Sequence, residues 1–346
     1  MILRLINTGS RKGMLVAFIM AVLLLLLPLA MKNKFYLHVM ILVFFYAAAS
    51  GAWNIIGGYG GQLSLGHAAF YGLGAYTSTL LYLHFSLTPW LGMLAAGLLS
   101  VIVAIAISYP CFRLRGPFFA LATLAFAEVM RLVSIFWRDL TAGSVGLLIP
   151  FKPGLANLIF RGKEPYYYMA LVLMLIVLTI SLWIENSKFG YYLEALKEDE
   201  DAAEALGVRT TRYKLLAASL SAFLTALCGV FMAQYILFIE PEGVFNMNLS
   251  VQLALIPVVG GIGSAWGPII GSFLLTPLNE FLRSWLGGDY NGLNFVLYGL
   301  ILITVVTLMP DGIYTSVKKL ITRRKPGQDL QNRHGKLAVK KQQTRG

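Results

Sequence analysis

Runs of about twenty consecutive apolar residues recur through this chain, and they constrain its fold more than any other feature. A helix of about twenty apolar residues crosses the roughly 30 Å of hydrocarbon in a bilayer. The 346 residues are 58% hydrophobic and only 13% charged, whereas about a quarter of the residues in soluble domains are charged. The sequence therefore predicts an all-α, polytopic membrane protein with no separate soluble catalytic domain.

We expect about ten transmembrane helices, with both termini on the cytoplasmic side. Basic residues collect on that side of a membrane protein, so Arg113 and Arg115 place the loop after the fourth span there. The predicted spans are residues 13–31, 35–56, a third span that ends near 83 after a kink at 57, and then 90–107, 118–137, 166–184, 213–238, 249–262, 266–286 and 293–309.

The transmembrane permease domain is expected to cover residues 1–317 and to be followed by a basic, disordered cytoplasmic tail at 318–346. The net charge of +12 does not indicate a nucleic-acid-binding protein. Ten of the 28 Lys and Arg residues lie after residue 317, and this distribution agrees with the tendency of basic residues to lie on the cytoplasmic side of a membrane. Cys111 and Cys228 are too few and too far apart for a disulfide framework or a metal site, so a structural role is expected.

Residues 185–214 form the one long charged segment within the apolar chain. Charge of this density cannot lie in hydrocarbon, so the segment must lie in water, on the side of Arg113. Apolar residues recur in it at helical spacing before Gly207, which is typical of a helix stop; they are Leu193, Leu196, Ala203 and Leu206.

This pattern predicts a short amphipathic helix at about 191–207. Its narrow apolar stripe must rest on the membrane surface, on its own bundle or in a groove of a partner. By spacing alone, an ordinary solvated loop helix is the simpler interpretation.

Segment 57–81 is too rich in glycine for an uninterrupted helix, which indicates close helix packing or a break that faces a cavity. Its GGYG at 57–60 is echoed by GGIG at 260–263, and paired glycine-broken segments in two halves point to a transport path. His67 could carry protons or bind a ligand, but a histidine hydrogen-bonded within the bundle is favoured. The residues assigned here to the path or to helix packing are Gly60, Gln62, Ser64, Gly66 and His67.

Glu128 and Arg131 carry opposite charges within the predicted span 118–137. Residues three apart share a helical face, and an unpaired charge in a span costs about 2.5–3.5 kcal/mol on insertion scales. We expect a structural ion pair inside the bundle, near the middle of that span. The two charges could instead clamp a zwitterionic solute.

Three stretches resemble the LivM-type permeases of branched-chain amino acid ATP-binding cassette (ABC) importers, in the order and at the approximate spacing of that family. They are GGYGGQLSLGHAAFYGLGAY, then GPFFALATLAFAEVMRL followed by LTAGSVG, and EALKEDEDAAEALGVRTTRYK. The resemblance covers nearly all of residues 52–310. Ala142 of LTAGSVG stands where the family tends to have glycine, and its methyl group is expected to limit a positive φ there.

Within the third stretch, Asp201-Ala202-Ala203 followed by Gly207 is similar to the EAA-x-x-x-G coupling motif of ABC importer permeases, with Asp in place of Glu. In that family the helix with this motif docks in a cleft of the ATP-hydrolysing subunit. The resemblance therefore implies an ATPase-coupling role for Glu194, Leu196, Asp201, Ala202, Ala203 and Gly207.

The resemblance implies a permease subunit of the cell inner membrane that imports Leu, Ile, Val or a related small solute. Its implied partners are a homologous second permease, two cytoplasmic ATPase subunits and an extracytoplasmic solute-binding protein. ATP is used by the partners, and no cofactor or metal is expected on this chain, which lacks a G-x-x-x-x-G-K-S/T loop.

Other readings of the sequence stay open at this point. A permease of the same family could carry urea or short amides, and a proton-coupled secondary transporter could use Glu128 as its proton carrier. A secondary transporter would not need the EAA-like helix. An enzyme is not expected, because no H-E-x-x-H or G-x-S-x-G motif is present and the histidines are scattered, at His38, His67, His84 and His334.

Overall fold

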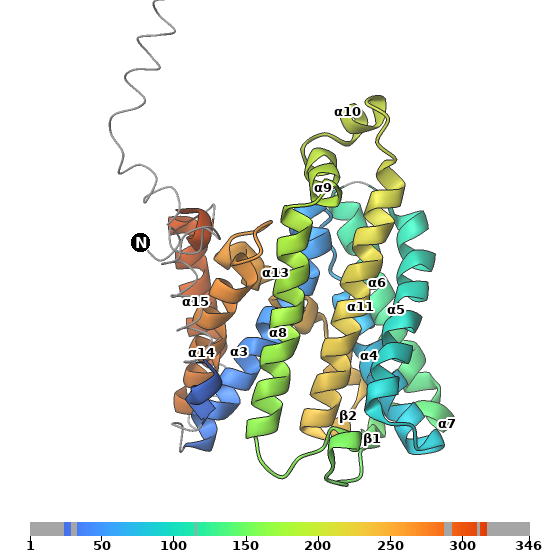
Figure 1. Cartoon of the computed structure of the whole chain (residues 1–346), viewed down its shortest axis with the longest axis vertical. Helices are drawn as coiled ribbons and strands as arrows, with labels where there is room; N and C mark the ends of the chain where they lie inside the picture. Colours follow the sequence, from blue (N-terminus) through green and yellow to red (C-terminus); the bar gives the residue numbers. More distant parts are fainter. Residues whose placement is uncertain (1–23, 29–32, 115, 287–292, 310–311, 317–346) are drawn as a thin grey trace, which may run out of the picture.

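The structure, a computed structural model, describes residues 24–28, 33–114, 116–286, 293–309 and 312–316, and it is almost entirely helical (Figure 1). The elements are α3 (Lys34–Asn54), η1 (Ile55–Tyr59), α4 (His67–Phe85), α5 (Pro89–Cys111), α6 (Pro117–Phe136), α7 (Arg138–Thr141), η2 (Gly143–Val145), β1 (Leu147–Leu148), η3 (Leu155–Asn157), α8 (Glu164–Glu185), α9 (Lys188–Glu198), α10 (Glu200–Ala205), α11 (Thr210–Ile236), β2 (Phe238–Ile239), α12 (Pro241–Val244), α13 (Met247–Gly260), α14 (Gly267–Leu286) and α15 (Leu293–Leu308).

Six helical segments of the described residues are long and apolar enough to cross a membrane, so the predicted all-α, polytopic membrane protein is confirmed. They are Lys34–Tyr59, Pro89–Cys111, Pro117–Phe136, Glu164–Glu185, Thr210–Ile236 and Pro241–Gly260. The helices α4, α14 and α15 match further predicted spans in position. The predicted first span lies outside the described residues except for 24–28, which are helical, and the whole tail at 318–346 lies outside them.

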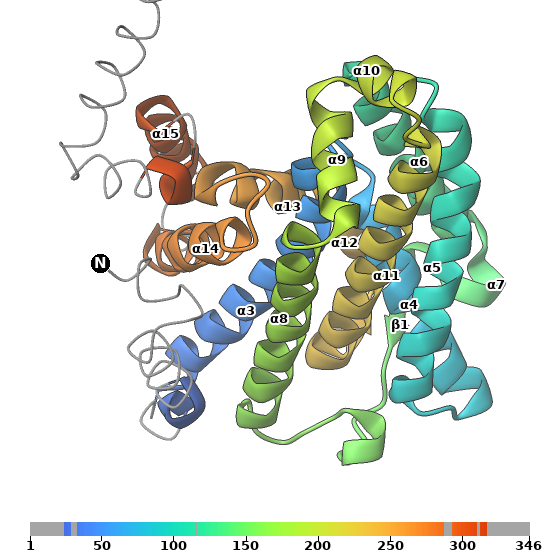
Figure 2. The same cartoon turned by 45° about the horizontal axis from the view of Figure 1, so that its top comes forward.

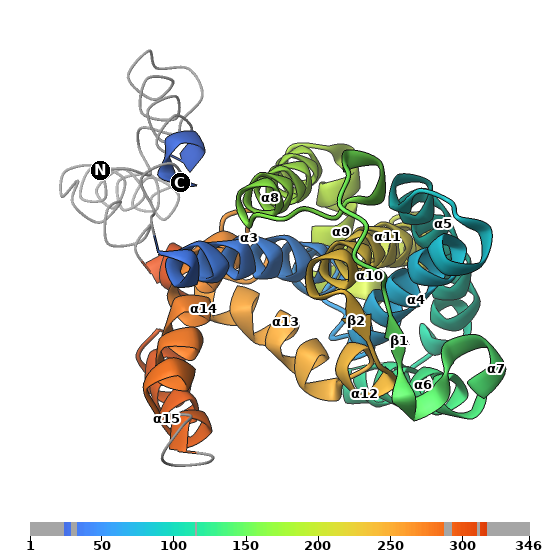
Figure 3. The ribbon, with the colours of Figure 1, turned by 90° about the horizontal axis from the view of Figure 1, so that it is seen from below.

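Helix α3 is the central element of the bundle. Its residues 41–45 are all buried, which requires neighbours on every side of the helix. Seen from one end, α3 lies between α8 on one side and α13 and α14 on the other (Figure 3). The approach of α8 is close, because a Cβ atom added at Gly51 would lie 2.8 Å from a methyl group of Val177.

Helices α4 and α11 pack backbone against backbone. A Cβ atom at Gly229 of α11 would collide with the carbonyl oxygen of Tyr71, and one at Gly74 of α4 would collide with that of Ala226. Small residues allow this approach, which gains van der Waals contact where burial from water cannot drive association. The two helices therefore depend on glycine at both contact points.

The two ends of the bundle carry different structures. At one end lie α9, α10 and the connection from α5 to α6, which contains Arg113 (Figures 1 and 2). At the opposite end β1 and β2 form a short antiparallel pair, with Leu147 opposite Ile239. The charged segment thus shares its end with Arg113, as predicted; Arg115 lies outside the described residues.

A methyl group at the α4–α11 contact should destabilise the bundle. We expect Gly229→Ala to lower the free energy of unfolding by about 1–3 kcal/mol, because an added methylene in a packed contact forces the backbones apart. Gly299→Ala in α15 is the control, since a Cβ atom there meets nothing within 4 Å. Thermal unfolding of the purified protein in detergent measures both variants; equal midpoints would contradict the described packing.

Candidate functional site

The two glycine-broken segments meet at the end of the bundle that carries α9 and α10. The buried Asn54 side chain joins them: its Nδ2 donates to the carbonyl oxygen of Ser264 at 3.0 Å, and its Oδ1 accepts from the amide of Gly263 at 3.0 Å. A Cβ atom at Gly58 would lie 2.7 Å from that amide nitrogen. The GGYG and GGIG motifs are therefore neighbours in space, more than 200 residues apart in sequence.

The last residue of α8 ties the same two segments together. Glu185 Oε1 accepts a hydrogen bond from the Tyr59 hydroxyl at 3.1 Å and one from the Ala265 amide at 2.6 Å. The carboxylate thus satisfies a backbone donor next to the second break while it fixes the π-helical turn η1. We call this group, with Asn54, Gly58, Tyr59, Glu185, Gly263, Ser264 and Ala265, the inner junction.

Helix α9 is attached to the inner junction through one lysine. Lys197 Nζ donates to the carbonyl oxygen of Gly58 at 3.1 Å. Gly61, which has a φ of +66°, lies against the side chain of Lys197, and a Cβ atom there would be 2.9 Å from its Cγ. The charged segment therefore contacts the first broken segment directly.

Helix α10 is attached to α11, the helix that follows it in the chain. Lys214 Nζ forms an ion pair with Glu200 at 2.6 Å, and the lysine side chain is only 3% exposed. Its ammonium also lies 5.7 Å from the ring centroid of Phe112. The Glu200 side chain is 25% exposed, so the lysine is the buried member of this pair. Removing Glu200 would leave the buried ammonium without its carboxylate, which is unfavourable.

The charged segment differs from the sequence prediction in being two helices. Asp199 has extended backbone angles, and its Oδ1 accepts from the amide of Ala202 at 3.0 Å, so it ends α9 and caps α10. Aspartate is favoured at such a cap because its short side chain satisfies a free amide. Gly207 follows the end of α10, as expected of a helix stop, and has a positive φ of +88°; a Cβ atom there would meet nothing within 4 Å.

The apolar stripe of this segment rests on its own bundle. Leu193, Leu196 and Ala203 are buried, whereas Leu206 is 86% exposed. The expectation that Leu196 faces a partner is therefore wrong, because that side chain contributes to the core of this chain. The exposed side carries Glu194, Asp201, Ala202, Glu204, Leu206 and Gly207, and sequence reasoning had not assigned Leu206 to the partner-facing side.

His67 is buried and hydrogen-bonded on both ring nitrogens, at 3.2 Å to the Ser64 hydroxyl and at 2.8 Å to that of Ser221. The Ser221 hydroxyl donates in turn to the carbonyl oxygen of Ala52 at 2.6 Å. These contacts join α3, α4 and α11. His67 is therefore hydrogen-bonded to side chains within the bundle.

The free amides at the start of α4 are satisfied by side chains of other helices. The Thr123 hydroxyl of α6 accepts from Leu65 at 3.0 Å, and the Ser250 hydroxyl of α13 accepts from Ala68 at 2.9 Å. A Cβ atom at Gly66 would lie 2.6 Å from the carbonyl oxygen of Thr123. A helix can begin inside the membrane only where such donors find partners. Gly60 is buried and Gln62 half-buried in the segment that leads to α4.

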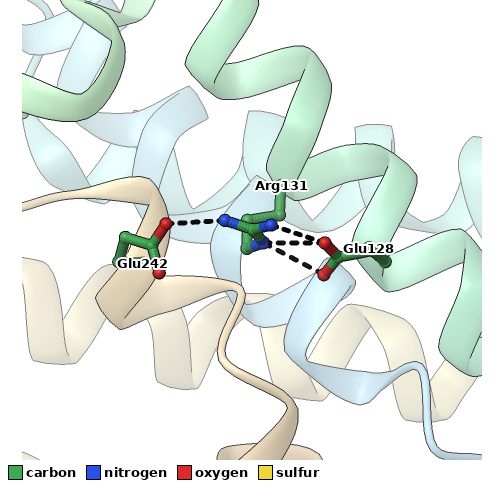
Figure 4. A network of polar contacts seen from close by, with 3 residues as sticks. All are labelled: Glu128, Arg131 and Glu242. Atoms are coloured by element: carbon green, nitrogen blue, oxygen red, sulfur yellow. Dashed lines mark hydrogen bonds and ion pairs between the residues drawn. The ribbon is translucent and has the colours of Figure 1, made fainter.

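Glu128 and Arg131 form the predicted pair, with a third partner (Figure 4). Arg131 Nε donates to both carboxylate oxygens of Glu128 at 3.1 and 3.0 Å, and its Nη1 pairs with Glu242 of α12 at 2.6 Å. The Glu128 side chain is 49% exposed, so the pair is not enclosed by this chain. It also lies toward the end of α6 that contacts α12, and not at mid-span. The network joins α6 to α12.

Ala142 adopts a left-handed conformation with a φ of +58°, although its methyl group was expected to limit a positive φ. Its amide donates to the carbonyl oxygen of Arg138 at 3.0 Å and closes α7. A left-handed non-glycine residue costs about 1–2 kcal/mol. The surrounding turn therefore holds the alanine in a strained conformation.

Membrane-length helices with two broken segments that meet at one end define a multi-pass membrane protein of the transporter class. Residues 35–306 match the family model described as "Branched-chain amino acid transport system / permease component". The chain belongs to this family, whose members are transport components and not enzymes.

Named relatives agree with this assignment. The high-affinity branched-chain amino acid transport system permease protein LivM of Salmonella typhimurium is 30% identical over 283 residues, which are 75% of this chain and 65% of the relative. LivM of Escherichia coli is 29% identical with the same coverage, and LivH of Salmonella typhimurium is 26% identical over 78% of this chain and 90% of the relative. The chain thus spans slightly less than two thirds of the length of the LivM relatives. No solved structure matches.

The three charges of the α6–α12 network predict a ranking of variants. Arg131→Gln should reduce assembled complex most, because it leaves Glu128 and Glu242 without their shared cation. Glu128→Gln should be milder, since Arg131 keeps Glu242 as a partner. Glu128→Gln combined with Arg131→Gln should recover part of the loss.

The measurements are the amount of complex purified in mild detergent and the uptake per complex. If the two charges clamp solute instead, the double variant should assemble normally and lose uptake at least as severely as either single variant.

Proposed function

We propose that this chain is a membrane-spanning permease subunit of an ABC importer that moves leucine, isoleucine, valine or a related small solute across the cell inner membrane. Membership of the permease family and the printed functions of the LivM and LivH relatives support this proposal. The partners are a homologous second permease, two cytoplasmic ATPase subunits and an extracytoplasmic binding protein. ATP is used by the ATPases, and this chain holds no cofactor.

The observation that carries the mechanism is the attachment of α9 to the inner junction. Exposed Glu194 and Leu206 of the α9–α10 pair offer a surface for an ATPase, while Lys197 reaches the carbonyl oxygen of Gly58 beside Gly263. Closure of the ATPases displaces α9 and α10, and Lys197 transmits that displacement to both broken segments. The transition is a rigid-body motion of packed elements, which interfaces of this kind permit.

The proposed topology has about ten spans and both termini in the cytoplasm. The described α4, α14 and α15 and the predicted span at 13–31 add to the six helices of clear membrane-spanning length. The permease domain extends over residues 1–317, and the basic tail at 318–346 is cytoplasmic.

Urea and short amides are the alternative solutes, because solute choice in such a system rests largely with the binding protein. A proton-coupled secondary transporter is disfavoured, since family membership supports an ABC importer and the α9–α10 pair would have no partner in a secondary transporter. Uptake of radiolabelled leucine by vesicles with the assembled complex tests the proposal. Import that depends on ATP and is not inhibited by urea or acetamide is the expected result; import without ATP would overturn it.

The sidedness of α9 and α10 can be measured with single cysteines. With Cys111 and Cys228 replaced, Glu204→Cys should be unreactive toward an impermeant thiol reagent added outside intact cells, because α10 is expected in the cytoplasm. Val145→Cys is the positive control, since Val145 is exposed at the opposite end. Rapid labelling of Glu204→Cys from outside would contradict the topology.

The coupling role of Lys197 and Gly207 predicts separation of ATP hydrolysis from transport. Lys197→Met removes the donor to Gly58, and Gly207→Val forces a β-branched residue into a positive φ at a cost of about 1–2 kcal/mol. Each should lower uptake per ATP several-fold in reconstituted vesicles while the bundle stays assembled. Lys188→Met and Gly207→Asn are the matched controls, and asparagine tolerates positive φ. Wild-type stoichiometry in both test variants would refute the role.

A further inference from the structure

A pocket of about 390 Å³ lies at the end of the bundle opposite to α9 and α10. Its position follows from its lining: His38 is near the start of α3, Ile236 is the last residue of α11, and Asn246 caps α13. Pockets for small ligands have volumes of about 300–1,000 Å³. In the proposed topology this pocket opens to the outside, where a solute enters.

Two opposite charges line this outer pocket from a single helix. Glu280 and Arg283 are three residues apart on α14, so they project from the same face about one turn apart. Glu280 is half-buried and Arg283 is exposed. Among the described residues, no hydrogen bond or ion pair joins the two side chains to each other.

Part of the pocket wall is apolar. Leu42 and Phe45 of α3 lie on it together with Met232 of α11 and Leu249 of α13, and the rest of the lining includes the polar side chains of His38, Asn246, Asn248 and Gln252. Leu42, Phe45 and Met232 are buried in the core, so their positions are held by packing. A wall of this kind suits an aliphatic side chain, whereas urea or a short amide would leave it unfilled.

The ion pairs of Arg131 and Lys214 differ from this pair, because their charged groups are joined to each other. The guanidinium of Arg131 is occupied by two carboxylates, those of Glu128 and Glu242. An acid and a base that are not joined to each other, beside an apolar wall, match the two charges and the side chain of an α-amino acid.

We propose that the outer pocket binds a branched-chain L-α-amino acid, with Glu280 facing the ammonium group, Arg283 facing the carboxylate and the apolar wall facing the aliphatic side chain. The proposal rests on the proposed function, because it treats the imported solute as an amino acid. It goes further in placing a solute site on this chain, so that selection does not depend on the binding protein alone.

The test uses the purified full-length chain in detergent and three probes of nearly equal shape. They are L-leucine, 3-methylbutylamine, which lacks the carboxylate, and 4-methylpentanoate, which lacks the ammonium group. Dissociation constants are measured by ligand-observed NMR titration. Leucine should bind at least about tenfold more tightly than either analogue, because each analogue loses a charge-assisted hydrogen bond.

Two variants assign the charges. Glu280→Gln should abolish the preference for leucine over 4-methylpentanoate and leave the preference over 3-methylbutylamine. Arg283→Gln should do the reverse. Glu164→Gln is the matched control, because Glu164 is an exposed acid at the start of α8, at the same end of the bundle, and does not line the pocket. Unchanged thermal midpoints verify that the variants are folded.

Leucine uptake by the assembled wild-type complex separates this inference from the proposed function. If that complex imports leucine but the purified chain binds the three probes alike, or the variants keep the wild-type preferences, only the outer pocket is refuted. If the complex imports no branched-chain amino acid, the proposed function fails, and the assignment of the pocket to such a solute fails with it.

Discussion

The fold depends on satisfying the backbone groups that two interrupted helices expose inside an apolar bundle. Without water, each free amide or carbonyl costs several kcal/mol unless a protein group pairs with it. At the inner junction, the Asn54 side chain satisfies one backbone amide and one backbone carbonyl of the second broken segment. Glu185 and Lys197 serve one further backbone donor and one further backbone acceptor. These side chains are therefore what permits glycine-broken segments at that depth.

The polar clusters described above lie at different positions along the bundle. At the inner end lie the junction and its attachments to α9 and α10. His67 and its serine partners connect three helices, and both of these partners are neutral hydroxyl groups. At the outer end lie the α6–α12 network and the outer pocket with Glu280 and Arg283. A solute that crosses from the outer pocket thus moves toward the segment on which the ATPases are proposed to act.

Much of this arrangement could be predicted from the sequence, for reasons that are local. Apolar runs indicated the positions of the spans, glycine density located the interruption before α4, and Gly207 was expected to end a helix. The role of Asn54 was missed because its partners are about 210 residues away. Leu196 was misassigned because helical spacing identifies an apolar face and not the surface that covers it. The charges of α14 were passed over, although the same three-residue spacing had drawn attention to Glu128 and Arg131.

The break at Asp199 divides the charged segment into two helices that contact the bundle separately. Helix α9 contacts the interrupted segments through the hydrogen bond from Lys197, and it contacts α11 through Tyr192, whose ring centroid lies 4.6 Å from that of Tyr213. Helix α10 contacts α11 through the ion pair of Lys214 with Glu200. If an ATPase docks on the two helices, as proposed, its displacement therefore reaches α11 through both of them, and it reaches the interrupted segments through Lys197 of α9.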